Sequence, residues 1–274
     1  MQAERRTPVA LTIAGSDSGG GAGIQADLKA FARCGVHGTS AIVALTAQNT
    51  VGVTAIHPIP PQMILAQVRA VAADIGVDAV KVGMLADETT IEAVAEALGE
   101  LEGAPIVVDP VMVAESGAVL LEPEAKGALI ERVLPLATVA TPNLPEAREL
   151  TGLGEDAAAE ELARAVLALG PGAVVVTGGH GDGGSSSSDV SVDVFVDGRA
   201  LELIEGPRHA EGASHGSGCT HSSVLAAQLA LGASPLEAAR SARRIAAEAV
   251  AAGLRDIGSG PGPVDVLGIS ARAR

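Results

Sequence analysis

Residues 215–220, with the sequence His-Gly-Ser-Gly-Cys-Thr, combine residue types that could bind an anion and place a nucleophile beside it. The apolar periodicity that follows, through residue 231, predicts a helix over 217–231. N–H groups at the start of a helix lack intrahelical partners and carry the positive end of its dipole. We therefore expect the backbone of residues 216–218 to hold an anion such as a transferring phosphoryl group.

Cys219 lies in the first turn of this predicted helix, where a thiolate should be favoured. The alternative is a small buried hydrophobe, which describes most free cysteines. The glycines around Cys219 favour function, whereas Cys34 has no such context and is interpreted as a core residue. The two cysteines form neither a disulfide framework nor a metal motif.

A second glycine cluster, residues 14–27, follows a predicted strand and opens a predicted helix. Residues 21–26 match the dinucleotide fingerprint G-x-G-x-x-A, but that motif needs an acidic residue about 20 positions on. Residues 36–53 contain none. We favour a turn that lets the backbone approach a small substrate, with Asp27 one helical turn further; a purely structural tight turn is the alternative.

Polar residues also follow two other buried strands. Asp109 ends one strand, and Asn143 and Glu146 lie three residues apart at a predicted helix start. In an open parallel sheet, ligands bind beyond the carboxyl ends of strands, so Asp109 should face a metal or phosphate. Asn143 and Glu146 could hold Mg²⁺ through water. The same spacing is found in a helix capping box, so the spacing does not decide between a Mg²⁺ site and a cap.

The amino-acid composition argues against several classes of function. Apolar residues make up 47% of the chain with two Phe and no Trp or Tyr, which indicates a small aliphatic core and argues against base stacking. The net charge of −15 argues against nucleic-acid or anionic-membrane partners. None of the three lysines follows a glycine, so no Walker A loop exists. Without an apolar h-region or an 18-residue apolar run, we expect a cytoplasmic protein.

Short apolar runs alternate with helical patterns, which is typical of an α/β fold with a mostly parallel sheet. The predicted strands are residues 9–15, 40–45, 51–56, 78–84, 105–109, 138–141 and 173–177, with a hairpin at 190–196 and 200–204. The predicted helices are 23–34, 61–73, 88–101, 123–133, 144–150, 156–169, 217–231 and 235–252. We expect one domain over 1–274, with flexible segments at 1–8 and 181–189.

In their order along nearly the whole chain, these segments resemble the hydroxymethylpyrimidine/phosphomethylpyrimidine kinases of thiamine biosynthesis, within the ribokinase-like superfamily. The matching motifs are residues 14–29, 45–50, 81–85, 109–112, 141–147, 178–180, 215–223 and 258–264. The resemblance implies a three-layer sandwich, with a mostly parallel central sheet, helices on both faces and a small β-hairpin. It also implies a homodimer that uses ATP and Mg²⁺ to phosphorylate 4-amino-5-hydroxymethyl-2-methylpyrimidine, and then its monophosphate.

The resemblance further assigns roles to single residues. The pyrimidine contacts of the family fall on Ala22, Asp27, Gln48, Met84 and Val111. Its metal ligands fall on Asp109 and Glu146, and its ATP and phosphate contacts on Asn143, Thr177 and Gly179. The catalytic anion hole falls on Gly216, Ser217 and Gly218, beside Cys219.

Some features leave alternatives open. Many relatives have a lysine where this chain has Thr177, and His221 replaces a typically apolar residue. The wider superfamily commonly has an aspartate base at the position of Cys219, so the thiol could remove the hydroxyl proton or only position the hydroxyl. The alternative functions are a vitamin B6 kinase, against which Gln48 favours the pyrimidine, and a non-catalytic ligand-binding relative.

Overall fold

All nine strands in the described part of the chain form one sheet, in the order β3-β2-β1-β4-β5-β6-β7-β8-β9. The structure is a computed structural model that describes residues 7–178 and 190–272. The predicted loop at 181–189, Gly179 and most of the predicted segment 1–8 lie outside the described residues. The strands are β1 (Val9–Asp17), β2 (His37–Asn49), β3 (Gly52–Pro58), β4 (Ala79–Val82), β5 (Ile106–Val108), β6 (Val139–Ala140), β7 (Ala173–Val176), β8 (Val190–Asp197) and β9 (Leu201–Pro207).

The sheet is parallel at its centre and antiparallel at both edges. Strands β2, β1, β4, β5, β6 and β7 pair in parallel, whereas β3 and the β8–β9 hairpin pair antiparallel. This arrangement confirms the predicted mostly parallel sheet and the hairpin. It also brings the carboxyl ends of the parallel strands to one edge, where ligands bind in such sheets.

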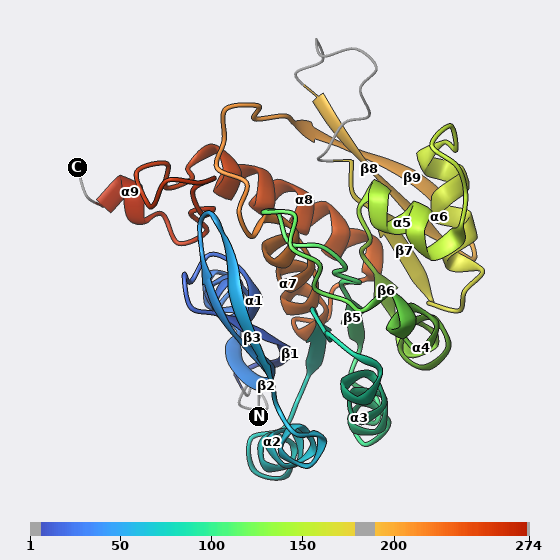
Figure 1. The fold of residues 1–274 in the computed structure, drawn as a ribbon. Coiled ribbons are helices and arrows are strands. Elements are labelled where there is room, and N and C mark those ends of the chain that lie inside the picture. Colours follow the sequence, from blue (N-terminus) through green and yellow to red (C-terminus); the bar gives the residue numbers. More distant parts are fainter. Residues whose placement is uncertain (1–6, 179–189, 273–274) are drawn as a thin grey trace, which may run out of the picture.

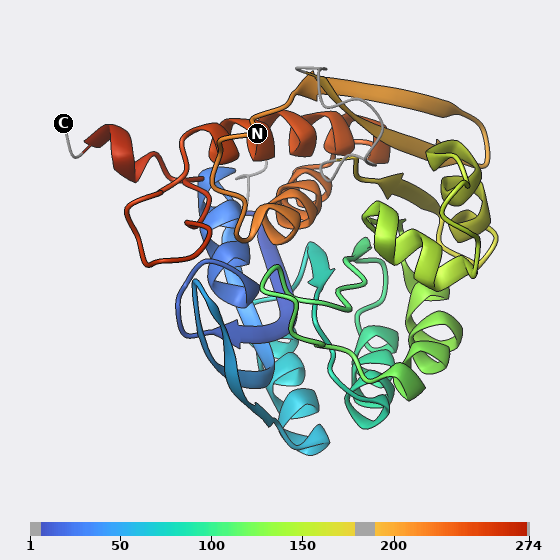
Figure 2. The ribbon, with the colours of Figure 1, turned by 45° about the horizontal axis from the view of Figure 1, so that its top comes forward.

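Helices cover both faces of the sheet (Figures 1 and 2). They are α1 (Gly23–Arg33), α2 (Pro61–Asp74), α3 (Glu88–Gly99), α4 (Lys126–Ala128), α5 (Leu144–Thr151), α6 (Ala159–Leu167), α7 (Ser217–Ala230), α8 (Pro235–Ala251) and α9 (Ile269–Arg272). None of the helices within the described ranges is long and apolar enough to cross a membrane.

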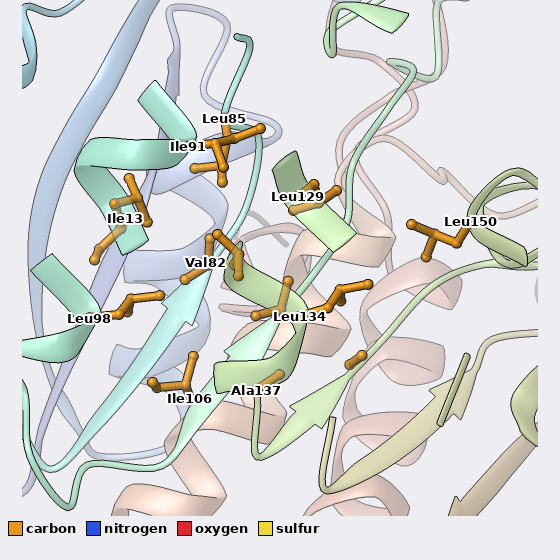
Figure 3. Close-up of a cluster of buried hydrophobic side chains, with 14 of the residues drawn as sticks. Ile13, Val82, Leu85, Ile91, Leu98, Ile106, Leu129, Leu134, Ala137 and Leu150 are labelled. Carbon is orange, nitrogen blue, oxygen red and sulfur yellow. The ribbon is translucent and has the colours of Figure 1, made fainter. Parts of the chain in front are cut away.

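The core consists of two apolar clusters, one on each face of the sheet. Side chains alternate along each strand, so Val80 and Val82 face one cluster and Ala79 faces the other. The first cluster packs β-strand side chains against α2, α3, α5, α6 and the helical run 123–136; Figure 3 shows Val82, Leu98 and Leu134 gathered in it. The second packs the opposite face against α1, α7 and α8. The three-layer sandwich is therefore confirmed.

Two segments differ from their predicted form. The helix predicted over 123–133 is an irregular run of 3₁₀, α and π turns that extends to residue 136. Gly127 weakens its interior and Pro135 supplies no N–H, so a regular α-helix is not favoured there. Strand β2 is longer than predicted because it continues as a two-stranded ribbon with β3 to Asn49.

Candidate active site

A cavity lies at the carboxyl ends of the parallel strands and faces the start of α7. This central cavity has a volume of about 580 Å³ and is lined by residues from β1, β2 and β4, by the loops that follow β4, β5, β6 and β7, and by the start of α7. A second, side cavity of about 350 Å³ lies between α8 and the segment after β9. The two cavities share lining residues, including Asn143 at the start of α5, Thr177 after β7 and Gly218 at the start of α7.

Two glycine-rich turns meet at the central cavity. Gly216, the N-cap of α7, has φ of +82°, and a Cβ there would lie 1.8 Å from the carbonyl oxygen of Gly21. Only glycine fits a left-handed position with so close a neighbour. The carboxylate of Asp17 fastens the first turn by accepting from the N–H groups of Gly19, Gly21 and Ala22. Ala22 and Gly23 of this first turn line the central cavity.

The start of α7 carries open N–H groups, as predicted. The N–H of Ser217 donates to Ser214 O, but within the described chain the N–H groups of Gly218 and Cys219 have no acceptor. Both residues line the central cavity. Two free N–H groups at the positive end of a helix form a site for an anion.

A buried charge cluster underlies the cavity. The ammonium of Lys81 lies 3.0 Å from Asp27 Oδ1 and 3.1 Å from Oδ2, and 4.0 Å from Asp109 Oδ2. Lys81 and Asp27 are fully buried, and Asp27 also accepts from Thr12 and Ser223 hydroxyls. Burial disfavours the ammonium, but the carboxylates of Asp27 and Asp109 and the nearby thiol hold the pKa of Lys81 above its ordinary value.

Asp27 is not among the residues that line the central cavity, because α1 directs its side chain to the buried ammonium of Lys81. Lys81 is itself one of the lining residues. A direct contact between Asp27 and a substrate therefore does not follow from the structure. Of the other predicted pyrimidine contacts, Ala22, Gln48, Met84 and Val111 all line the cavity. Gly15 makes room for Met84, whose sulfur would lie 2.9 Å from a Cβ at residue 15.

The state of Cys219 also differs from expectation. Burial raises the pKa of its thiol to about 12; Lys81 and the Gly23 N–H lower it, but the carboxylates of Asp27 and Asp109 raise it further. The prediction that the helix start favours a thiolate is thus wrong for this structure. Desolvation and two nearby carboxylates outweigh the helix end, so Cys219 is a neutral thiol at neutral pH.

Asn143 and Glu146 form the capping box that their spacing allowed. The N–H of Glu146 donates to Asn143 Oδ1 at 2.8 Å, and the N–H of Asn143 donates to Glu146 Oε2 at 2.9 Å. Both residues nevertheless line the central cavity. Capping therefore does not exclude a role at the site, because it fixes the Glu146 carboxylate at the cavity wall.

The two candidate metal ligands resist ionisation. Burial raises the pKa of Asp109, although Lys81 and a hydrogen bond of 2.9 Å from the Ser222 hydroxyl oppose the shift. Burial and the charge of Asp109 raise the pKa of Glu146 to about 8. Within the described chain, no group of three His, Cys, Asp or Glu side chains gathers closely enough to hold a metal. Two carboxylates that disfavour each other's charge are the fit expected for a shared cation.

His215 lines the central cavity, but it was not among the residues predicted to act in the site. Its Nε2 lies 3.2 Å from Asp17 Oδ2 and its Nδ1 lies 3.7 Å from Glu115 Oε2. The hydrogen bonds to Asp17 and Glu115 raise the pKa of His215 to about 9, despite partial burial, so the ring is an imidazolium at neutral pH. Lys81 was also missed, although a lysine inside the apolar run 79–84 was its signal. For His215 the partners are too distant in sequence to give a signal.

Thr177 and Asn143 lie together at the boundary of the two cavities, where β6 and β7 end side by side. Gly179, the third predicted phosphate contact, lies outside the described residues. The open parallel sheet, the helix start with open N–H groups and the two adjoining cavities agree with the resemblance to small-molecule kinases of the ribokinase-like class.

Comparison with known proteins gives the family. The phosphomethylpyrimidine kinase family model matches residues 17–265. A hydroxymethylpyrimidine/phosphomethylpyrimidine kinase of Rhizobium meliloti is 48% identical over 262 residues, which cover 94% of this chain and 96% of the relative. The chain belongs to the phosphomethylpyrimidine kinase family.

Solved structures agree with this assignment. A phosphomethylpyrimidine kinase from Clostridium difficile is 41% identical with a TM-score of 0.77, covering 89% of this chain and all of that one. An ADP complex of Bacillus subtilis pyridoxal kinase is 38% identical with a TM-score of 0.85, covering 98% of this chain and all of that one. The fold is therefore shared by kinases that are named for two different substrates.

Proposed function

We propose that this chain transfers a phosphoryl group from ATP to 4-amino-5-hydroxymethyl-2-methylpyrimidine, and then a second one to the resulting monophosphate. The observation that carries the proposal is the meeting of two cavities at the open N–H groups of Gly218 and Cys219. The acceptor would occupy the central cavity and the nucleotide the side cavity. The transferring group would then lie at the helix start, where developing negative charge is stabilised.

In the acceptor cavity, Gln48 supplies an amide that can both donate to and accept from an aminopyrimidine edge. Met84 and Val111 supply apolar walls for the ring. Because the Cys219 thiol is neutral, we infer that it orients the acceptor hydroxyl rather than removing its proton in the resting enzyme. The hydroxyl oxygen bonds to the γ-phosphorus as the bridging P–O bond breaks, ADP leaves with the electron pair of that bond, and the hydroxyl proton passes to solvent water.

Asp109 and Glu146 would hold Mg²⁺ together with phosphate oxygens and water, which is how this ion usually binds beside nucleotides. Their fit is chemical: both are oxygen donors at the cavity, and burial raises the pKa of each, a cost that a bound divalent cation would offset. When bound, Mg²⁺ would neutralise charge on the phosphates.

The runner-up is a vitamin B6 kinase, which the likeness to Bacillus subtilis pyridoxal kinase favours. One assay separates the possibilities: ADP release is measured with the hydroxymethylpyrimidine, its monophosphate and pyridoxal as acceptors. We expect the highest kcat/KM with the pyrimidine and measurable turnover of its monophosphate. Faster turnover of pyridoxal would support the runner-up. Binding of the pyrimidine without ADP release would indicate a non-catalytic relative.

We also propose a homodimer. The ribbon formed by β2 and β3 exposes apolar side chains at the sheet edge, namely Leu45, Val51 and Ile56. Exposed apolar groups at an unpaired edge are typical of a contact surface. Light scattering after size exclusion should give twice the chain mass of 27.1 kDa, and a monomer would reject this proposal.

A further inference from the structure

At the junction between the two cavities, only one of the described residues that line both has a side chain that can carry a positive charge. Both cavities are lined by Glu115, Asn143, Thr177, Ser214, Ser217, Gly218 and His221. Among these shared residues, only His221 can carry a positive charge. A phosphate chain that crosses from the side cavity to the central cavity must pass this junction.

His221 is nearly buried on α7, with 5% of its surface exposed, and it faces a carboxylate on β8. Its Nε2 lies 3.3 Å from Asp193 Oδ2, an ion-pair contact without hydrogen-bond geometry. Within the described residues, neither ring nitrogen of His221 nor Oδ2 of Asp193 has a hydrogen-bond partner. Buried polar groups are normally paired, so this arrangement is incomplete without a further group.

The Asp193 carboxylate has further partners besides His221. Its Oδ1 accepts from the N–H of Gly178 at 3.1 Å, and the guanidinium of Arg243 lies 3.9 Å away. Burial alone would raise the pKa of Asp193, but His221, Arg243 and the Gly178 N–H hold it below its ordinary value. The carboxylate is therefore ionised, and it can orient the imidazole ring.

Three other cationic side chains near the junction each have at least one hydrogen-bond or ion-pair partner. Lys81 is paired with Asp27, and His215 with Asp17. The Arg243 guanidinium donates to the carbonyls of Ser191, Gly206 and Pro207, which ties α8 to the hairpin. β7 is followed by the uncharged Thr177. Among the residues that line both cavities, His221 is the one whose ring nitrogens are buried without a hydrogen-bond partner within the described residues.

We propose that His221, oriented by Asp193, hydrogen-bonds the phosphate chain of the nucleotide where the two cavities meet. The torsion about the Cβ–Cγ bond of histidine is soft, so the ring can turn a nitrogen to the junction at little cost. Between a carboxylate and a phosphate the ring donates from both nitrogens. This inference rests on the proposed kinase function and adds a nucleotide-binding residue to it.

The test is calorimetric binding of a non-hydrolysable ATP analogue, of adenosine and of the pyrimidine to the wild type and to His221→Leu. Loss of a charged hydrogen bond to phosphate should weaken the analogue about 10-fold or more, with adenosine and pyrimidine unchanged. His221→Gln, which keeps a donor, should recover part of the affinity, and Asp193→Asn should weaken the analogue alone. His37→Leu is the matched control, because His37 is exposed at the start of β2 and lines neither cavity.

Wild-type affinity for the analogue in a folded His221→Leu protein overturns the inference, as does an equal loss of adenosine and analogue. If His221→Leu does not fold, the same comparison is made with His221→Gln, for which a loss equal for both ligands has the same meaning. A wild-type protein that binds the pyrimidine but no adenine nucleotide rejects the kinase function itself.

Discussion

Replacing Lys81 with methionine tests the buried charge cluster most directly. The substitution keeps the length of the side chain but removes the ammonium that lies 3.0 and 3.1 Å from the two oxygens of Asp27. Both side chains are fully buried. Breaking a buried ion pair on one side leaves an uncompensated charge and costs about 3–5 kcal/mol. For a chain of this size, that corresponds to a fall in Tm of about 6–20 °C.

The assay is thermal and urea unfolding of Lys81→Met at pH 7. The double variant Lys81→Met/Asp27→Asn should recover at least half of the lost stability, because the carboxylate nearest to the lost ammonium no longer carries a charge. The control Arg69→Met breaks a solvent-exposed contact with Glu100 and should change Tm far less. A loss below about 1 kcal/mol in Lys81→Met, or no recovery in the double variant, would refute the reasoning.

Three further predictions concern the titratable groups of the site. Because the Cys219 thiol has a pKa of about 12, iodoacetamide at pH 7.5 should label it more slowly than in the urea-unfolded chain; faster labelling would contradict the neutral thiol. His215 has a folded pKa of about 9 against 6.5 unfolded, so its stabilisation is complete below pH 6.5 and is lost as pH rises to 9. Urea midpoints should therefore fall over that range, and fall less in His215→Gln. Since Mg²⁺ must displace the proton of Glu146, whose pKa is about 8, calorimetric Mg²⁺ affinity should rise between pH 6.5 and 8.5, and Glu146→Gln should reduce that slope.

Most of the fold could be predicted from local sequence signals. Apolar runs with Val and Ile predicted the strands, and Pro or small polar residues marked helix starts, because these signals act over a few residues. The capping box at Asn143 was visible for the same reason. The irregular run 123–136 was not foreseen, although Gly127 and Pro135 were local signals against a regular α-helix.

Most of the predicted site residues line the central cavity. Asp27 does not, and it shows what could not be predicted from the sequence. Motifs far apart in the chain converge because the parallel strands all end at the same edge. The direction of a single side chain on α1 is set by packing, and so Asp27 turns to a buried ammonium instead of the cavity. Sequence spacing does not reveal such a choice.

The helix start at residues 215–220 shows which properties the sequence alone determined and which only the tertiary structure decided. Its glycines, its open N–H groups and the place of Cys219 in the first turn were determined by the sequence alone, because each depends on local backbone geometry. The charge states were decided only by the tertiary structure. His215 becomes an imidazolium because Asp17 lies 198 residues away in the chain but 3.2 Å away in space. Cys219 stays a thiol because the fold removes water and brings two carboxylates near it.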